Sequence, residues 1–151
     1  MRRIIFLCHG NICRSVAAEW IARHYAETHA LSEPFEIQSR ACSSEEIGND
    51  IYPPMKAALR RAGIPFGPHQ ARRLSQEDYQ HSDVIYYMDG SNIRLLGYSF
   101  TDHKRIFKPI FEGMPFSEIE DPWYTGNFDL VVKQLSACIE NIFRAYKIEK
   151  N

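Results

Sequence analysis

Residues 3–15 read RIIFLCHGNICRS, and this stretch decides the fold. Its first part, Arg3–Leu7, is a short apolar run, which is typical of a strand buried on both faces of a sheet. A helical pattern follows the loop, and its expected inner face consists of Val16, Trp20, Ile21 and His24. Because a strand leads through a short loop directly into a helix, the stretch predicts the first unit of an α/β fold.

The rest of the chain continues to alternate strands and helices. Further short strands are predicted at Phe35–Ser39, Val84–Met88 and Arg105–Phe107. Helices are predicted at Pro53–Gly63, Ser75–Tyr79 and Asp89–Gly97, and a last helix carries Val131, Leu135, Cys138, Ile142 and Tyr146. This order predicts a three-layer α/β/α fold with a four-stranded parallel sheet, flavodoxin- or Rossmann-like. In such folds the ligand binds beyond the carboxyl ends of the strands.

Composition is that of an ordinary globular protein. The 151 residues, 44% hydrophobic and 25% charged, fit a single domain spanning residues 1–151. The net charge of −1, from 18 basic and 19 acidic side chains, argues against a broad nucleic-acid-binding face. No stretch has membrane-spanning length, and the first apolar run is too short for a signal peptide. We therefore expect a cytoplasmic protein that acts without a membrane.

The cysteines are too sparse for a disulfide scaffold. They are Cys8, Cys13, Cys42 and Cys138. No C-x-x-C or paired Cys/His cluster suggests zinc, so we expect neither a metal nor another cofactor. In a reducing compartment each thiol is either buried or reactive.

The loop Cys8–Ser15 has the features of an anion site. Gly10 and Asn11 tolerate positive φ, so the loop can curl and point its N–H groups inward, towards an anion near the start of the next helix. The same field would stabilise a thiolate at Cys8, and the planar fork of Arg14 fits two phosphate oxygens. The alternative is that Cys8 is a buried structural thiol.

The same C-x5-R spacing occurs a second time in the chain. Cys138 and Arg144 lie in the periodic last helix with no glycine between them, so no anion nest is expected there. We interpret Cys138 as a buried packing residue.

Several motifs together point to a known family. Cys8-His9-Gly10-Asn11-Ile12-Cys13-Arg14-Ser15 resembles the signature loop of the low-molecular-weight protein tyrosine phosphatases. Gly63-Ile64-Pro65 followed by His69-Gln70-Ala71-Arg72 resembles another family segment. So do Met88-Asp89-Gly90-Ser91-Asn92 and Asp121-Pro122-Trp123-Tyr124. The motifs occur in the family's order across nearly the whole chain.

The resemblance implies hydrolysis of phosphotyrosine in protein substrates through a cysteinyl-phosphate, with phosphate as product. It makes Cys8 the nucleophile, Arg14 the phosphate clamp and Asp121 the general acid and base. The remaining phosphate-binding residues would be those of the loop, namely His9, Gly10, Asn11, Ile12, Cys13 and Ser15. Glu112, Glu118 and Glu120 are alternative acids in the region of Asp121, whose Asp-Pro pair could also be a simple turn.

Supporting roles also follow from the resemblance. Ser15 would donate a hydrogen bond to Cys8, and a left-handed Asn11 would be braced by Ser15, Ser39 and His69. The plainer readings are a helix N-cap for Ser15, a strand-end residue for Ser39 and an ordinary loop histidine for His69.

Two further roles concern the aromatic slot and the second cysteine of the loop. Trp123 and Tyr124 would line a slot for the substrate ring, or instead anchor their loop in the core. Cys13 would form a reversible disulfide with Cys8, or instead be a packed thiol.

Three positions depart from the family pattern. Val16 stands where many relatives have proline, and Gly90 stands where an acidic residue is common. Glu45 replaces an aromatic residue of the cleft wall seen in the animal enzymes, and it could repel acidic peptides or favour basic flanking residues. These departures concern substrate preference rather than the core chemistry.

Other functions remain as alternatives. A thioredoxin-linked arsenate reductase shares this fold and loop, but the chain has no cysteine between Cys42 and Cys138 to relay a disulfide. A protein arginine phosphatase would carry threonine in place of Ile12. A phosphate-binding module without catalysis would be expected to lack Cys8, Arg14 or Asp121. We expect a monomer, with a weak dimer as the alternative; the sequence does not identify the physiological substrate.

Overall fold

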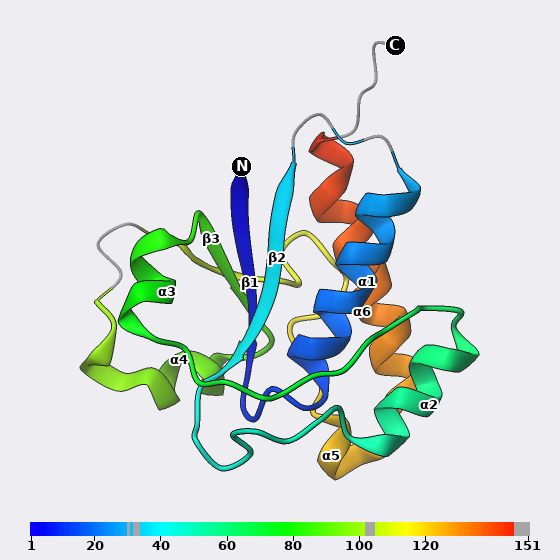
Figure 1. Ribbon diagram of the computed structural model, residues 1–151, viewed down its shortest axis with the longest axis horizontal. Coiled ribbons are helices and arrows are strands. Elements are labelled where there is room, and N and C mark those ends of the chain that lie inside the picture. Colours follow the sequence, from blue (N-terminus) through cyan, green and yellow to red (C-terminus); the bar gives the residue numbers. More distant parts are fainter. Residues whose placement is uncertain (30, 32–33, 102–104, 147–151) are drawn as a thin grey trace.

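The computed structural model describes residues 1–29, 31, 34–101 and 105–146. Four parallel strands form its sheet in the order β2-β1-β3-β4 (Figure 1). They are β1 (Arg2–Cys8), β2 (Phe35–Ala41), β3 (Val84–Tyr87) and β4 (Phe107–Pro109). The chain adds β2 on one side of β1 and then β3 and β4 on the other side. The switch point of this flavodoxin-like sheet therefore lies between β1 and β3. The predicted fold class is confirmed.

Helices cover both faces of the sheet (Figure 1). On one face lie α1 (Arg14–Thr28), α2 (Pro53–Arg61) and α6 (Phe128–Phe143). On the other lie α3 (Gln76–His81) and α4 (Gly90–Leu96). Short elements complete the chain: η1 (Gly97–Ser99), α5 (Pro122–Thr125) and η2 (Arg144–Tyr146).

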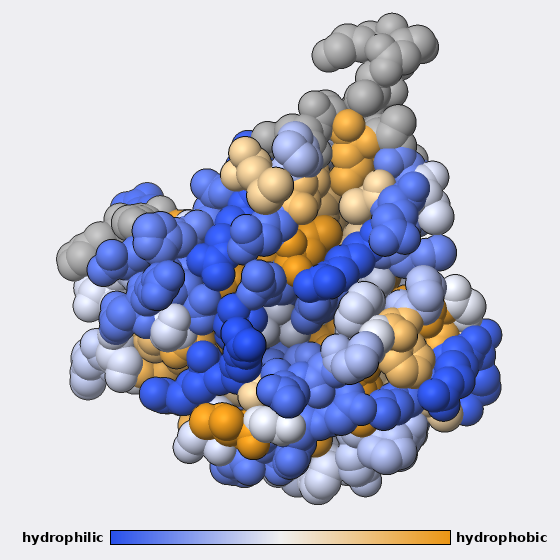
Figure 2. Space-filling model, in the orientation of Figure 1, coloured by the Kyte–Doolittle hydropathy of each residue, from blue (hydrophilic) through white to orange (hydrophobic). Residues whose placement is uncertain are grey.

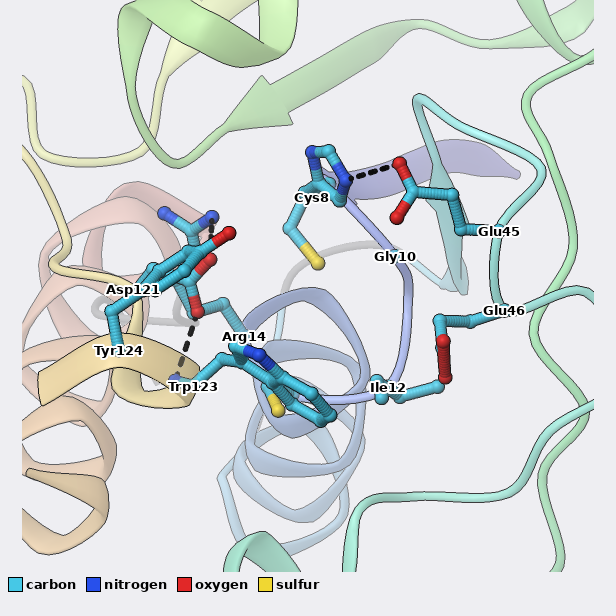
Figure 3. A pocket seen from close by; sticks show the side chains of 11 residues that line it. Cys8, Gly10, Ile12, Arg14, Glu45, Glu46, Asp121, Trp123 and Tyr124 are labelled. Carbon is cyan, nitrogen blue, oxygen red and sulfur yellow. Dashed lines mark hydrogen bonds and ion pairs between the residues drawn. The ribbon is translucent and has the colours of Figure 1, made fainter. Parts of the chain in front are cut away.

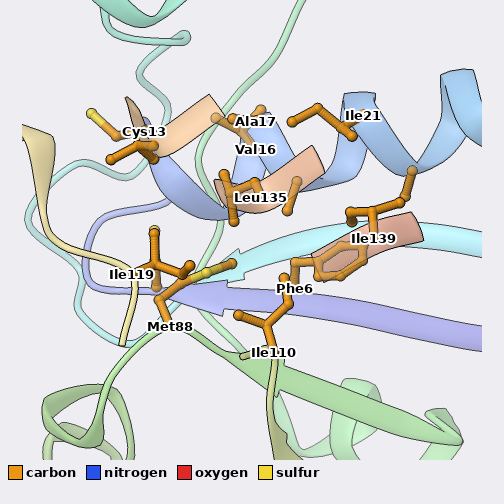
Figure 4. Packing of buried hydrophobic residues seen from close by; sticks show 14 of the residues in the cluster. Phe6, Cys13, Val16, Ala17, Ile21, Met88, Ile110, Ile119, Leu135 and Ile139 are labelled. Atoms are coloured by element: carbon orange, nitrogen blue, oxygen red, sulfur yellow. The ribbon is translucent and has the colours of Figure 1, made fainter. Parts of the chain in front are cut away.

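The central strand β1 is buried on both faces, which explains its continuous apolar sequence. Phe6 packs into the cluster formed with α1 and α6, where Val16, Leu135 and Ile139 converge on it (Figure 4). Leu7 points to the opposite face and packs into the smaller cluster with α3 and α4. The two clusters fix β1, and therefore the position at which the chain leaves it, at Cys8.

Local signals in the sequence set the helix ends. Pro53 opens α2, and Gly63 follows its end with φ of 75°, a left-handed conformation that glycine adopts without a steric penalty. Asp89 caps α4, because its carboxylate accepts hydrogen bonds from the backbone amides of Ser91 and Asn92. The helices predicted to begin at Ser75 and at Asp89 are both confirmed, and each of these residues is the N-cap of its helix.

The structure corrects several expected boundaries. The fourth strand is Phe107–Pro109 rather than Arg105–Phe107, because pairing with β3 begins at Phe107. Ser39 lies inside β2 rather than at its end. Ser15 lies inside α1, whose N-cap position is Cys13, so Ser15 is not an N-cap.

The helix faces differ from the sequence expectation in part. Val16 and Ile21 are fully buried in α1, as expected, but Trp20 and His24 are only partly buried. At the other end of the chain α6 stops at Phe143, and Tyr146 lies in η2.

The viewed surface is mostly hydrophilic, with apolar side chains in separate patches (Figure 2). Among the described residues, no helix combines the length and the apolar character that crossing a bilayer requires.

Asp78 should stabilise the fold in a pH-dependent manner. Its carboxylate accepts hydrogen bonds from Arg40 Nε at 2.9 Å and from Arg3 Nη2 at 3.1 Å. Burial alone would raise its pKa, but the Ser75 amide and Arg40 hold the pKa below its ordinary value. We expect Asp78→Asn to lower the free energy of unfolding by about 3 kcal/mol at pH 7 in urea denaturation.

The difference between wild type and Asp78→Asn should shrink as the pH falls. A lowered folded-state pKa contributes stability above the ordinary carboxyl pKa of about 3.9, and this contribution is lost as the pH falls through the folded-state value. The matched control is Asp129→Asn, which removes an exposed ion pair with Arg61 and should cost less than about 1 kcal/mol. Equal effects of the two variants at pH 7 would contradict this account.

Candidate active site

A pocket lies at the carboxyl end of β1, where the chain turns into α1 (Figure 3). It is lined by Cys8, His9, Gly10, Ile12, Cys13, Arg14, Glu45, Glu46, Asp121, Trp123 and Tyr124. The sheet thus brings together residues from the first loop, the segment after β2 and the segment around α5. This is the edge at which ligands bind in open parallel sheets.

Arg14 is buried, with 2% of its surface exposed, and its guanidinium is held from several sides. Nη1 donates hydrogen bonds to Asp89 Oδ2 at 2.6 Å and to the Ile119 carbonyl oxygen at 2.8 Å. Nη2 lies 3.5 Å from Asp121 Oδ2. Although burial opposes its charge, the neighbouring Cys8, Asp89 and Asp121 raise the pKa of Arg14. The cation is therefore permanent and fixed in orientation.

The contact with Arg14 lowers the pKa of Asp89, whereas it raises the pKa of Arg14. Burial tends to raise the pKa of its carboxyl group, but the hydrogen bond from Arg14 and those from Ser91 hold the pKa below its ordinary value. Asp89 is therefore ionised at neutral pH and serves both as the cap of α4 and as the partner of Arg14.

The Cys8 thiol faces the pocket and is in contact with Ser15. Cys8 Sγ and Ser15 Oγ are hydrogen-bonded at 3.0 Å, and the backbone N–H of Ser15 donates to Sγ at 3.4 Å. In the first of these bonds the thiol donates to the hydroxyl oxygen. Because Ser15 lies in the first turn of α1, its N–H group belongs to the end of the helix that carries a partial positive charge. A thiolate at this position is surrounded by donors and by the Arg14 cation.

Asn11 stabilises the tight curve of the loop. It is fully buried and has φ of 63°, the left-handed conformation that the family resemblance implied. Its side-chain amide donates to Ser15 Oγ at 2.8 Å and to Ser39 Oγ at 2.9 Å. Its Oδ1 accepts from the Arg72 amide at 3.1 Å, and its carbonyl oxygen lies 2.6 Å from His69 Nε2. These contacts offset the cost of the unusual backbone conformation.

Gly10 is needed for a different reason than expected. It does not adopt positive φ; Asn11 does so instead. A Cβ atom on Gly10 would lie 3.2 Å from Glu46 Cγ, a tighter contact than such atoms normally make. The absence of a side chain at Gly10 therefore lets the segment after β2 approach the loop.

The opposite wall is formed by α5. The Asp121 carboxylate caps this helix by accepting a hydrogen bond from the Trp123 amide at 3.0 Å. The Trp123 ring packs on Tyr52 with centroids 4.6 Å apart, and it is 51% exposed; Tyr124 is 84% exposed. The reading of these aromatics as core anchors is therefore wrong. Both line the pocket, on the same side as Asp121 (Figure 3).

The alternative acids lie outside the pocket lining. Glu112 and Glu118 are exposed, and Glu120 accepts a hydrogen bond from Asn127 at 2.9 Å. Of the candidate acids in this region, Asp121 alone is a lining residue of this pocket and an ion-pair partner of Arg14 among the described contacts.

The other three thiols differ from Cys8 in their surroundings. Burial raises the pKa of Cys13 and Cys42, and nearby Cys8 adds to the shift. Burial raises the pKa of Cys138 to about 11, and this residue is fully enclosed in the core face of α6, as the sequence analysis expected. All four cysteines are free thiols, so the Cys8–Cys13 disulfide stays a prediction.

Sequence reasoning missed several residues of the site. The sequence places Asp89 at the start of a predicted helix and does not indicate its contact with Arg14, although its place just after β3 is a signal. Glu19 accepts a hydrogen bond from Ser39 at 2.5 Å and pairs with Arg23, which extends the support of Asn11. Glu46, for which the sequence carries no motif, lines the pocket beside Glu45. In the described part of the chain, no cluster of His, Cys, Asp or Glu is arranged to hold a metal ion.

Comparison with known proteins agrees with this geometry. The family model described as "Low molecular weight phosphotyrosine protein phosphatase" matches residues 3–151. The chain is 33% identical over 154 residues to low molecular weight protein-tyrosine-phosphatase YfkJ of Bacillus subtilis, covering 99% of each protein. It is 33% identical over 144 residues to the Homo sapiens low molecular weight phosphotyrosine protein phosphatase, covering 91% of this chain and 90% of the relative.

The chain belongs to the low molecular weight phosphotyrosine protein phosphatase family.

Solved structures of this phosphatase family superpose on it closely. The crystal structure of Bacillus subtilis YfkJ gives a TM-score of 0.89 at 31% identity and covers 100% of this chain and 98% of that one. The low molecular weight protein tyrosine phosphatase of Streptococcus pyogenes gives 0.86 at 26% identity, covering 99% and 96%. The likeness extends over the whole sheet and both helical layers.

Iodoacetate should alkylate Cys8 ahead of the other three cysteines. Cys8 faces the pocket beside Arg14, which attracts the reagent's carboxylate, whereas raised pKa values keep the other three thiols protonated at neutral pH. Peptide mass spectrometry should find one early adduct, which is absent in Cys8→Ser and slowed by inorganic phosphate. Equally fast labelling of Cys13 or Cys42 would contradict this assignment.

Proposed function

We propose that this chain is a protein tyrosine phosphatase that hydrolyses phosphotyrosine through a cysteinyl-phosphate on Cys8. The observation that carries the proposal is the convergence of Cys8, Arg14 and Asp121 on one pocket. A nucleophile, a fixed cation for phosphate oxygens and a carboxyl group for proton transfer are the groups that phosphate ester hydrolysis uses. Family membership supports the same activity.

The first step transfers the phosphoryl group to sulfur. The Cys8 thiolate attacks phosphorus, the bond from phosphorus to the tyrosine oxygen breaks, and protonated Asp121 gives its proton to the leaving phenolate. Arg14 and the backbone N–H groups of the loop bind the equatorial phosphate oxygens, where charge is spread in the transition state. The backbone N–H of Ser15 donates to the anionic sulfur, and once the thiol has lost its proton the Ser15 hydroxyl can turn to donate to it as well.

The second step releases phosphate. Asp121, now ionised, takes a proton from a water molecule that attacks phosphorus, the phosphorus–sulfur bond breaks, and inorganic phosphate leaves. Cys8 returns as a thiolate and Asp121 as an acid, so one water molecule is consumed and no other reactant is needed. Asp121 is 26% exposed at the side chain, which gives water access to it.

The pocket walls favour an aromatic ester. Trp123 and Tyr124 are exposed residues of the pocket wall, where a flat ring can stack, and Ile12 is a buried apolar residue of the same lining. These features support phosphotyrosine over phosphoarginine. His9, Gly10, Cys13 and Glu45 complete the proposed substrate-binding set, with Ser39 and His69 as supporting residues.

A disulfide-relay reductase is less well supported. Cys42 belongs to the cluster on the α3 and α4 face, whereas Cys8 belongs to the cluster on the opposite face of the sheet. The chain offers no other cysteine between Cys42 and Cys138. We further propose that the enzyme works on phosphoproteins in the cytoplasm, as a single-domain monomer without a metal or cofactor.

Variants of the three central residues test the chemistry. With a phosphotyrosine peptide, Cys8→Ser should abolish turnover, and Arg14→Lys should lower kcat by about 100-fold or more, because a point charge cannot replace the bidentate fork. Asp121→Asn should lower kcat by roughly 100-fold or more. The matched controls are Cys138→Ser, Arg144→Lys and Glu120→Gln, which should retain turnover. Near-wild-type rates in Arg14→Lys would refute the clamp.

Substrate class is tested with two peptides of one sequence that carry either phosphotyrosine or phosphoarginine. Wild type should release phosphate faster from the phosphotyrosine peptide, and a chelator should leave the rate unchanged. A preference for phosphoarginine would be compatible with Cys8 as the nucleophile but would contradict the proposed role of Trp123 and Tyr124 in binding an aromatic ring. Loss of activity with chelator would argue against a metal-independent mechanism.

A further inference from the structure

The two flanks of the pocket carry opposite charges, and the sheet order is the cause. Strand β1, which ends at Cys8, lies between β2 and β3. The segment after β2 therefore borders one side of the loop, and α4, which follows β3, borders the other. A peptide bound through phosphotyrosine at Cys8 would extend over both flanks.

The flank after β2 is acidic. Glu45 and Glu46 both line the pocket there, and the Glu45 side chain is 69% exposed (Figure 3). Glu45 Oε1 lies 3.1 Å from Nε2 of His9, another lining residue of the pocket. An acidic side chain of a substrate would meet two carboxylates on this side.

The flank formed by α4 carries an available cation. A groove lined by Ser91, Arg94 and Leu95 adjoins the pocket, with which it shares lining residues that include Tyr124. Arg94 is exposed, and its guanidinium has no hydrogen-bond or ion-pair partner among the described residues. Leu95, 46% exposed, adds an apolar surface beside it.

Gly90 lies beside the Arg94 guanidinium and offers it no side-chain partner. A Cβ atom at Gly90 would lie 3.0 Å from Arg94 Nη1, so the guanidinium packs over a position that has no side chain. An acidic residue at this position would be well placed to neutralise it. The glycine noted as a departure from the family pattern thus leaves the arginine free to bind a substrate.

The acidic groups in the same groove are already engaged. Asp89 bonds to Arg14 and to the amides that begin α4, and Asp121 caps α5 and faces Arg14. Their charges are therefore largely balanced by the buried guanidinium and by helix N–H groups. Because exposed charges are screened beyond about 10 Å, a substrate group gains most from a direct contact with Arg94.

We propose that the groove at Ser91, Arg94 and Leu95 is a subsite for an acidic side chain next to phosphotyrosine, while Glu45 and Glu46 favour a basic or neutral residue on the other side. The preferred substrates are phosphotyrosine peptides with this charge asymmetry. The proposal rests on the proposed function and deepens it, since it names the sequence context that the same site selects.

The test compares two peptides of identical composition, Asp-Ala-pTyr-Ala-Lys and Lys-Ala-pTyr-Ala-Asp, each with uncharged termini. A third peptide has Ser in place of both the Asp and the Lys. Wild type should prefer one order over the other by about 2- to 5-fold in kcat/KM, mainly through KM, as expected for an exposed ion pair. Arg94→Gln should lower the ratio of the two peptides and leave the part that comes from Glu45 and Glu46, whereas Arg94→Glu, which makes both flanks acidic, should bring the ratio close to one. The matched control, Arg144→Gln, removes a distant exposed arginine and should keep the wild-type ratio.

The outcomes separate this proposal from the proposed function. Equal kcat/KM for both orders in wild type, or an unchanged ratio in Arg94→Gln, would overturn the subsite while turnover of the Ser peptide upholds the phosphatase. Failure of wild type to hydrolyse the Ser peptide and p-nitrophenyl phosphate would overturn both. A ratio that falls in Arg94→Gln and approaches one in Arg94→Glu establishes the subsite.

Discussion

The guanidinium of Arg14 is the group around which the site is built. A buried charge is costly unless it is paired and hydrogen-bonded, and Arg14 meets this requirement with Asp89, the Ile119 carbonyl and the nearby Asp121. These partners come from three segments of the chain: the end of β3, the stretch after β4 and the start of α5. The Ile119 amide in turn donates to the Met88 carbonyl at 2.9 Å, which ties two of these segments together. One cation thus fixes the relative positions of the phosphate loop and the proposed acid.

The loop that presents Arg14 depends on a second constraint. Asn11 adopts a left-handed conformation, which costs a residue other than glycine about 1 kcal/mol or more. Contacts from Ser15, Ser39, Arg72 and His69 hold it there, and all but Ser15 belong to segments outside the loop. The curvature of the loop is therefore set by the surrounding fold before any phosphate binds, which is the preorganisation that electrostatic catalysis requires.

The fold and the centre of the site could be predicted from sequence because their signals are local. The apolar run of β1, the Gly10-Asn11 pair and the caps at Ser75 and Asp89 each act within a few residues. The partners of Arg14 could not be found in this way, since they lie 75 and 105 residues away and one is a backbone carbonyl. The sequence predicts the fourth strand two residues too early, because three residues at a sheet edge leave almost no pattern. Arg94 carried no motif at all; its significance depends on the strand order and on the missing side chain of Gly90.

The central claim is that phosphoryl transfer passes through Cys8, and rapid-quench mass spectrometry tests it most directly. Wild type and Asp121→Asn would be mixed with a phosphotyrosine peptide, stopped with acid within milliseconds and digested. The account predicts one added phosphoryl group on the peptide that contains Cys8. This phosphorylated form should accumulate to a higher level in any variant in which the attack of water on the cysteinyl-phosphate is slowed more than phosphoryl transfer to Cys8. Phosphate release with no phosphoryl group on Cys8 at any time, or a phosphoryl group on another residue that turns over at the catalytic rate, would contradict the account.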